Sequence, residues 1–303
     1  MATTFEIAMP YGTPNAVAAA DDALDLIDDL EEQLTVYRDT SEICRINATA
    51  FDGPVAVETR LFQLLRRATT LTAQTSGAFD LASGSLIKAW GFYRREGRIP
   101  SPRELAEARD ASGMKHVILN ADDSTIKFRR PGLELNLGGI GKGYAIDRAV
   151  ELLRSKWGIA SALVHGGGSS VYALGSPPGQ PRGWSIALKH PGNDRRSLGT
   201  VYLKDRGLGT SAATFQFFEY NGKKYGHLLD PRTGWPAERT ANATAIANTA
   251  SEADALSTAF FVLGTPAALE YCRTRPELAA VMLPDEPDAQ PTTIGLSPGR
   301  YVP

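Results

Sequence analysis

A glycine-rich stretch near the middle of the chain has the composition of an anion-binding turn. In LNLGGIGKGYAIDRA, residues 135–149, an apolar strand pattern passes through glycines into a helical pattern. This order directs backbone N–H groups and a helix N-terminus at an anion. A phosphate-binding P-loop needs glycine at Asn136 and serine or threonine at Gly143, so that motif is excluded. A turn required only for tight packing remains the alternative.

The second stretch, SEADALSTAFFVLG at 251–264, combines a carboxylate and a hydroxyl at helical spacing. Asp254 and Thr258 are four residues apart, which places both side chains on one helical face, where they suit a hard cation. Ser251 and Asp254 also have the spacing of a capping box, in which the aspartate only satisfies the first turn. These residues alone favour capping.

The third stretch, YGHLLDPRTGWPAE at 225–238, carries the histidine His227 close to an expected strand end. Asp-Pro and Thr-Gly turns follow, so the imidazole lies beside a loop. A histidine in that place is suited to accept a proton from an attacking hydroxyl. A packed or surface histidine fits the motif equally well.

The elements that must position these residues are predicted from periodicity and turn signals. Helices are expected at 16–34, 60–75, 102–112, 144–157 and 252–263, the last being the final well-defined element. Strands at 116–120, 125–128 and 133–137 are expected to form a small antiparallel meander, and further strands cluster between 162 and 229. Asn221-Gly222 predicts a two-residue hairpin turn. Helices followed by clustered strands indicate an α+β fold.

Composition excludes several classes of protein. The 303 residues include 43% apolar and 22% charged residues, with a net charge of -2. No basic tail suggests nucleic acid, and no apolar run is long enough for membrane insertion. The N-terminus shows neither a signal peptide nor a lipoprotein cysteine, so a cytoplasmic location is expected. Cys44 and Cys272 lie far apart without metal-ligand spacing, and reduced thiols are expected.

Taken together, the three stretches and two further motifs resemble the FAD:protein FMN transferases of the ApbE-like family. The further motifs are TSGAFD at 75–80 and WGF at 90–92. The resemblance begins near VYRDTSEICRIN at 36–47 and continues through LVHGGG at 163–168 and LGTSAA at 208–213 to Gly264. It covers most of the chain.

The resemblance implies an α+β fold of largely antiparallel sheets flanked by helices. It implies a single domain over 1–303, in one or two lobes, with FAD in a central cleft and Mg²⁺ on the pyrophosphate. FMN would pass through a phosphoester to a threonine of an acceptor protein with a Ser/Asp-Gly-Ala-Thr-like motif, and AMP would be released.

The resemblance also implies a role for each matching residue. The metal ligands would be the main-chain carbonyl of Gly139 and the side chains of Asp254 and Thr258. The resemblance therefore favours metal binding over capping as the role of Asp254. His227 would be the general base. The cofactor-binding residues would be Tyr37, Ala78, Phe79, Asp80, Asn136 and Lys142.

Three positions depart from the family pattern. Asn136 and Ser169 stand where the family carries aspartate, and Ala212 stands where it carries glycine. HGGG at 165–168 is also found in esterase oxyanion loops, but no GxSxG motif accompanies it, so His165 is expected to be a loop residue. Two alternatives remain open: a Mg²⁺-dependent FAD pyrophosphatase that releases FMN and AMP, and a non-catalytic FAD-binding protein.

Overall fold

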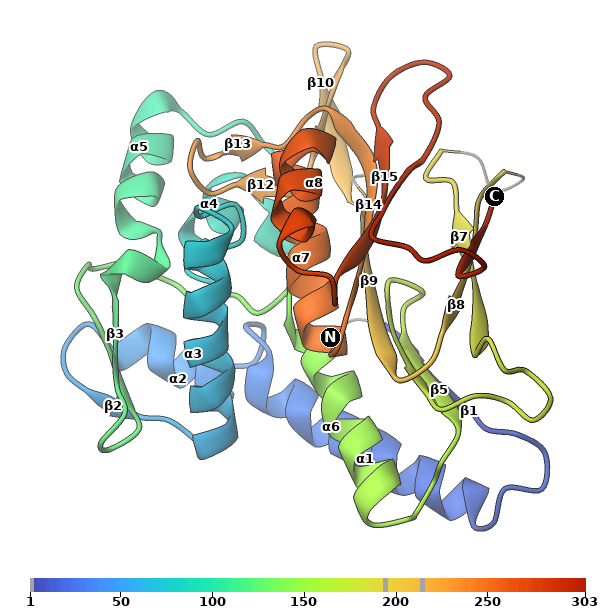
Figure 1. Cartoon of the computed structure of the whole chain (residues 1–303). Coiled ribbons are helices and arrows are strands. Elements are labelled where there is room, and N and C mark those ends of the chain that lie inside the picture. Colours follow the sequence, from blue (N-terminus) through green and yellow to red (C-terminus); the bar gives the residue numbers. More distant parts are fainter. Residues whose placement is uncertain (1–2, 193–195, 213–215) are drawn as a thin grey trace. The chain divides into compact units, whose positions relative to one another are not determined.

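The chain forms two compact units in the computed structural model, which describes residues 3–192, 196–212 and 216–303 (Figure 1). Unit 1 comprises Met1–Glu31, Ile140–Ala212 and Arg239–Pro303. Unit 2 comprises Glu32–Gly139 and Ala213–Glu238. Ala213, the last residue of the LGTSAA motif, lies outside the described residues. The expectation of one domain in one or two lobes stays a prediction.

Unit 1 contains two antiparallel sheets. The larger has the strand order β1-β5-β6-β9-β14-β15-β16 and the smaller the order β17-β8-β7. The larger sheet consists of β1 (Phe5–Ala8), β5 (Ala162–Gly166), β6 (Ser170–Leu174), β9 (Arg206–Ala212), β14 (Thr240–Ala247), β15 (Ala279–Pro284) and β16 (Thr292–Ile294). The smaller consists of β7 (Trp184–Lys189), β8 (Ser197–Leu203) and β17 (Tyr301–Val302).

The two faces of strand β9 have different neighbours because side chains alternate along a strand. Gly207 and Gly209 meet helix α7 (Ala250–Leu263). Leu208 points the other way, into a core shared with β7 and β8. Helix α7 also packs on β14 and on helix α6 (Gly141–Ser155), and its residues are buried on nearly every side. This burial explains why most of its residues are small or apolar.

Two more helices complete unit 1. Helix α1 (Ala16–Leu34) begins in unit 1 and ends in unit 2, and helix α8 (Thr265–Arg273) follows α7 directly. None of the helices in the described part of the chain has both the length and the apolar character that crossing a bilayer demands.

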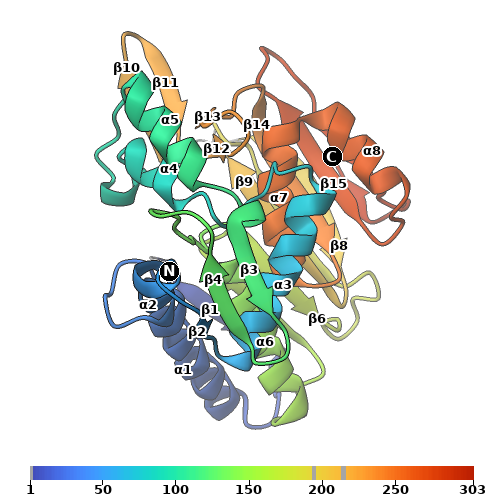
Figure 2. The same cartoon turned by 90° about the vertical axis from the view of Figure 1, so that its left-hand side faces the viewer.

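Unit 2 is richer in short elements, and Figure 2 shows its strands β3 and β4 side by side. Its core joins Trp90 and Phe92 to leucines from three elements. Its helices are α2 (Glu42–Thr49), α3 (Thr59–Gln74), α4 (Gly84–Ala89) and α5 (Pro102–Ala111), with short 3-10 turns η1 (Phe92–Arg94) and η2 (Met114–His116). Its antiparallel strands are β2 (Val55–Ala56), β3 (Val117–Asn120), β4 (Thr125–Phe128), β10 (Phe217–Tyr220), β11 (Lys223–Gly226), β12 (Leu229–Asp230) and β13 (Trp235–Pro236).

Most predicted elements are confirmed, including the largely antiparallel α+β class and the hairpin at Asn221-Gly222. The strand expected at 133–137 is wrong. Its alternate leucines are buried, but Leu135 donates its N–H to Asn47 Oδ1 at 2.8 Å and accepts from Asn47 Nδ2 at 3.0 Å. The side-chain amide of Asn47 therefore takes the hydrogen bonds that a neighbouring strand would have made. The third strand of the small sheet with β3 and β4 is β2. Helix 252–263 is also not the final element, because α8 and β15 follow it.

We expect Gly209→Ala to destabilise the fold. A Cβ at this position would lie 2.5 Å from the carbonyl carbon of Ala253 in α7, and both backbones would have to move apart. Overpacking of this kind costs about 1–3 kcal/mol of unfolding free energy. Urea unfolding measures the loss. Gly53→Ala is the matched control, because no atom lies within 4 Å of its added Cβ. Equal stability of both variants would contradict the close approach of α7 to β9.

Candidate active site

The N-terminus of helix α7 is capped by residues other than those that the sequence suggested. Thr249 is the N-cap, and its hydroxyl accepts from the N–H of Glu252 at 3.2 Å. The Asp147 carboxylate, from α6, accepts from the N–H of Ala250 at 2.7 Å and of Ser251 at 2.9 Å. The N–H groups in the first turn of α7 are therefore bound by Thr249 and Asp147. The capping-box interpretation of Ser251 and Asp254 is wrong.

The Asp254 carboxylate is instead held in the interior of unit 1, with the residue 3% exposed. Oδ2 accepts from the N–H of Gly143 at 3.2 Å, and Oδ1 accepts from the Ser170 hydroxyl at 3.1 Å. Lys142 Nζ lies 3.8 Å from Oδ1. The N-terminus of α6 and an ammonium group both favour a negative charge, so the buried carboxylate is compensated.

Hydroxyl groups gather one turn further along α7. Ser211 Oγ, on β9, lies 2.9 Å from Ser257 Oγ and 3.3 Å from Thr258 Oγ1. Thr258 is half-buried, and its hydroxyl donates to the carbonyl oxygen of Asp254 at 3.4 Å. The predicted ligands Asp254 and Thr258 therefore lie on the same face of α7, beside the predicted cofactor residue Lys142.

The donor chemistry of this cluster fits Mg²⁺. A carboxylate and aliphatic hydroxyls are hard oxygen ligands. Within the described ranges no group of three or more His, Cys, Asp or Glu side chains is arranged to hold a metal. A cation at Asp254 would thus have one protein carboxylate and would take further oxygens from carbonyls, water or substrate phosphates, as Mg²⁺ commonly does.

The glycine-rich turn before α6 is shaped by Asn136. Asn136 Oδ1 accepts from the N–H of Gly138 at 2.9 Å, and its own N–H donates to the carbonyl of Leu81 at 2.8 Å. Gly139, the predicted carbonyl ligand, follows in this turn and is half-buried. An amide oxygen is therefore sufficient to form the turn, although the family carries a carboxylate here.

The predicted flavin-binding turn follows helix α3, as expected. Ala78 and Phe79 are only 1% and 2% exposed. Asp80 Oδ1 accepts from the N–H of Ala82 at 2.8 Å, and Met114 donates its N–H to both oxygens. Burial raises the pKa of the Asp80 carboxyl, while the two N–H groups oppose the rise. These contacts fix the turn, and flavin binding by its residues stays a prediction. Tyr37 lies in the loop between α1 and α2 and is 63% exposed.

His227 directly follows strand β11, so its predicted place beside a loop is confirmed. Its N–H and its ring Nδ1 are each 3.0 Å from the carbonyl oxygen of Gln216. Gln216 Nε2 in turn donates to the carbonyl of Phe92 at 3.0 Å. A carbonyl oxygen only accepts, so Nδ1 donates to it, and an uncharged ring in this arrangement would have its lone pair on Nε2, as a general base needs.

Sequence reasoning missed four residues that position the expected ones: Asp147, Ser170, Gly143 and Gln216. Asp147 and Ser170 lie 103 and 84 residues from their partners on α7. The only local signal was the small residue at Gly143, where a Cβ would meet the backbone of Ala250.

Ser169 and Ala212, two of the residues that differ from the family pattern, make regular backbone contacts. The carbonyl of Ser169 accepts from the N–H of Thr210 at 2.7 Å. Ala212 pairs with Asn242 in the ladder between β9 and β14. His165 was expected in a loop, but it lies in β5 opposite Glu6 of β1, with Nε2 3.5 Å from the Glu6 carboxylate. Strand pairing with the N-terminal segment, which the sequence did not reveal, accounts for this difference.

Comparison with known proteins decides the family. The family model described as "ApbE family" matches residues 1–282. The chain belongs to the ApbE family. A relative from Treponema pallidum named FAD:protein FMN transferase is 34% identical over 89% of this chain and 78% of its own length. The match confirms the resemblance found in the sequence.

Solved ApbE structures share the fold. The ApbE protein of Thermotoga maritima is 27% identical, with a TM-score of 0.85 over 96% of this chain and 97% of its own. The flavin transferase ApbE of Vibrio cholerae is 26% identical, with a TM-score of 0.83 over 97% and 94% of the two chains. The antiparallel α+β architecture is thus the one found in ApbE proteins.

We expect Asp147→Asn to weaken the start of α7. An amide offers one acceptor where the carboxylate offers two, so one of two N–H groups loses its partner and the helix N-terminus loses a negative charge. The loss should be about 1–2 kcal/mol of unfolding free energy. Urea titration measures it. Asp123→Asn is the control, because an exposed turn aspartate tolerates asparagine. If both variants unfold alike, Asp147 does not cap α7.

Proposed function

We propose that this protein transfers FMN from FAD to an acceptor protein and releases AMP. Membership of the ApbE family and the transferase name of the 34% identical relative support the reaction. The observation that carries the proposal is the buried Asp254 carboxylate, which contacts Gly143 and Lys142 at the start of α6 and has Thr258 one turn further along α7. A hard-cation ligand beside an ammonium and a helix N-terminus suits a metal-bound pyrophosphate.

Mg²⁺ is the proposed cofactor. The Asp254 carboxylate and the Thr258 hydroxyl would hold it, and the family resemblance adds the main-chain carbonyl of Gly139. When bound, the ion would neutralise negative charge on the pyrophosphate oxygens. Lys142 would contribute a further positive charge to the same anion.

The transfer step follows ordinary phosphoryl-transfer chemistry. The acceptor threonine oxygen forms a bond to the FMN-side phosphorus, and the bond from that phosphorus to the bridging oxygen breaks. The bridging oxygen and its electron pair leave with AMP. Nε2 of His227 accepts the hydroxyl proton as the new bond forms. Gln216 supports this role because its carbonyl oxygen favours a proton on Nδ1 rather than on Nε2.

The remaining assignments are proposals that rest on the resemblance. Tyr37, Ala78, Phe79, Asp80 and Asn136 are assigned to the flavin. An acceptor with a Ser/Asp-Gly-Ala-Thr-like motif is the proposed partner, and a cytoplasmic location is the proposed compartment.

One assay tests the reaction. The protein is incubated with FAD, Mg²⁺ and a peptide that carries the acceptor motif, while peptide mass and AMP are followed. A peptide heavier by FMN, together with one AMP per peptide, supports the transferase. AMP with unmodified peptide identifies a pyrophosphatase, in which water replaces the threonine. FAD binding without either product identifies a non-catalytic flavin-binding protein.

We expect Asp254→Asn to remove Mg²⁺-dependent turnover. Asparagine keeps the shape and one acceptor but removes the charge that binds the cation, so kcat/KM should fall by at least about 100-fold. Turnover at several Mg²⁺ concentrations measures the effect, and thermal unfolding shows whether the fold is kept. Asp205→Asn is the matched control, because Asp205 also accepts from a backbone N–H and from an arginine in unit 1. Full activity of Asp254→Asn would overturn the metal assignment.

A further inference from the structure

The Tyr37 ring is exposed to solvent yet held on one side. The residue is 63% exposed, and its ring stacks on that of Tyr93, with centroids 4.9 Å apart and planes tilted by 30°. Aromatic pairs in this range of distance attract each other beyond simple burial. An exposed side chain that is already ordered loses little rotamer entropy when a ligand binds it.

Tyr93 also holds the backbone beside Tyr37. Its hydroxyl donates to the carbonyl of Val36 at 2.6 Å. Burial raises the pKa of Tyr93, so the hydroxyl keeps the proton that it donates. One side chain in η1 therefore fixes both the ring of Tyr37 and the main chain just before it.

A lysine and a glutamate fix Tyr93 in turn. Lys88 Nζ, on α4, lies 5.0 Å from the centroid of the Tyr93 ring. The same ammonium pairs with Glu134 at 2.6 Å. The cation is thus held over the ring by a carboxylate from a different segment of unit 2.

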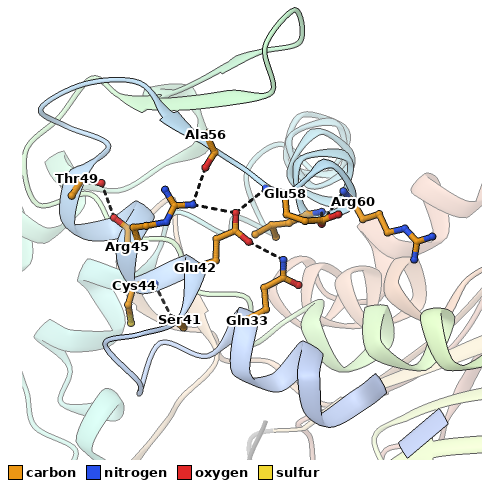
Figure 3. Close-up of polar contacts among 10 residues, drawn as sticks. Gln33, Ser41, Glu42, Cys44, Arg45, Thr49, Ala56, Glu58 and Arg60 are labelled. Carbon is orange, nitrogen blue, oxygen red and sulfur yellow. Dashed lines mark hydrogen bonds and ion pairs between the residues drawn. The ribbon is translucent and has the colours of Figure 1, made fainter. Parts of the chain in front are cut away.

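The ends of the loop are anchored independently of Tyr93, around Glu42 (Figure 3). Gln33 Nε2 donates to Glu42 Oε2 at 2.8 Å, which joins the last turn of α1 to the first residue of α2 on either side of the loop 35–41. The N–H of Glu58 donates to Glu42 Oε1 at 2.8 Å, and the glutamate side chain is only 15% exposed. Ser41 caps α2 and donates to the carbonyl of Thr35 at 2.6 Å. We therefore expect the loop to keep its path when Tyr93 is changed, with only its centre losing support.

We propose that Tyr93 is a positioning residue that holds the Tyr37 ring as a preformed stacking surface for the isoalloxazine of FAD. The proposal rests on the proposed function, because it requires FAD as the ligand. It adds a residue that makes no flavin contact itself and acts through the order of Tyr37. Loss of the Tyr93 side chain should weaken FAD binding and leave the chemical step unchanged, because Tyr37 and its loop would contact the flavin and not the pyrophosphate.

The test compares Tyr93→Phe, Tyr93→Leu, Tyr37→Leu and the Tyr37→Leu/Tyr93→Leu double variant. FAD affinity is measured by titration of the flavin absorption band, and kcat and KM are measured in the peptide assay. Tyr93→Leu should raise Kd and KM for FAD about threefold to tenfold with kcat at saturating FAD unchanged. Tyr93→Phe, which keeps the stack and loses only the hydrogen bond, should cost less. Tyr11→Leu is the matched control, since Tyr11 is a fully solvated tyrosine of unit 1.

The double variant decides between positioning and a merely structural role. If Tyr93 acts through Tyr37, the double variant binds FAD as Tyr37→Leu does, and the absorption spectrum of flavin bound to Tyr93→Leu moves toward that of Tyr37→Leu. Additive losses, or an unchanged Kd in Tyr93→Leu, would overturn the proposal. Wild-type protein that binds FAD but forms neither AMP nor modified peptide contradicts the proposed function alone. Wild-type protein that does not bind FAD contradicts both.

Discussion

The close approach of helix α7 to strand β9 and helix α6 is the constraint on which the rest of unit 1 depends. Glycines at 143, 207 and 209 leave no Cβ between these backbones, so α7 lies in the interior and Asp254 lies there with it. A buried carboxylate without partners costs several kcal/mol. The N–H of Gly143 and the hydroxyl of Ser170 supply those partners. Gly143 thus has two roles, because its lack of a side chain lets α6 and α7 approach and its N–H binds the buried carboxylate of Asp254.

The charge balance at Asp254 favours a polyanionic ligand. The ammonium of Lys142 already compensates the carboxylate, so a divalent cation added there leaves an excess of positive charge in a buried place. A diphosphate linkage removes that excess, because its oxygens accept both the cation and the ammonium. In the proposed function, the metal and FAD would therefore support each other's binding, because each balances the charge of the other. Such coupling would let one protein carboxylate suffice where metal sites without a substrate phosphate usually need several.

The sequence predicted the elements whose signals are local. Helix α1 was predicted from its periodicity over Ala16–Leu34, and the hairpin from Asn221-Gly222, because each depends on neighbouring residues. The strand at 133–137 was wrong since Asn47, 88 residues from Leu135, takes the backbone groups that a neighbouring strand would have paired. The cap of α7 was wrong for two reasons: the N-cap is Thr249, two residues before Ser251, and the Asp147 carboxylate comes from another helix. The sequence also indicated Asp254 as a candidate ligand, but its partners Gly143 and Ser170 come from segments 111 and 84 residues away.

The three departures from the family pattern lie at positions where the backbone conformation does not require a particular side chain. At Asn136 the turn needs one acceptor for the N–H of Gly138, and an amide oxygen supplies it as a carboxylate would. At Ala212 the chain is an extended strand in register with Asn242, a conformation that any residue with a Cβ adopts. Ser169 contributes its carbonyl, which every residue has. By contrast, the roles proposed for Asp254, Thr258 and Lys142 depend on a carboxylate, a hydroxyl and an ammonium, which are side-chain groups and not backbone groups. The proposed roles therefore fall on side-chain groups, whereas at the altered positions a backbone contact or a single amide acceptor is enough.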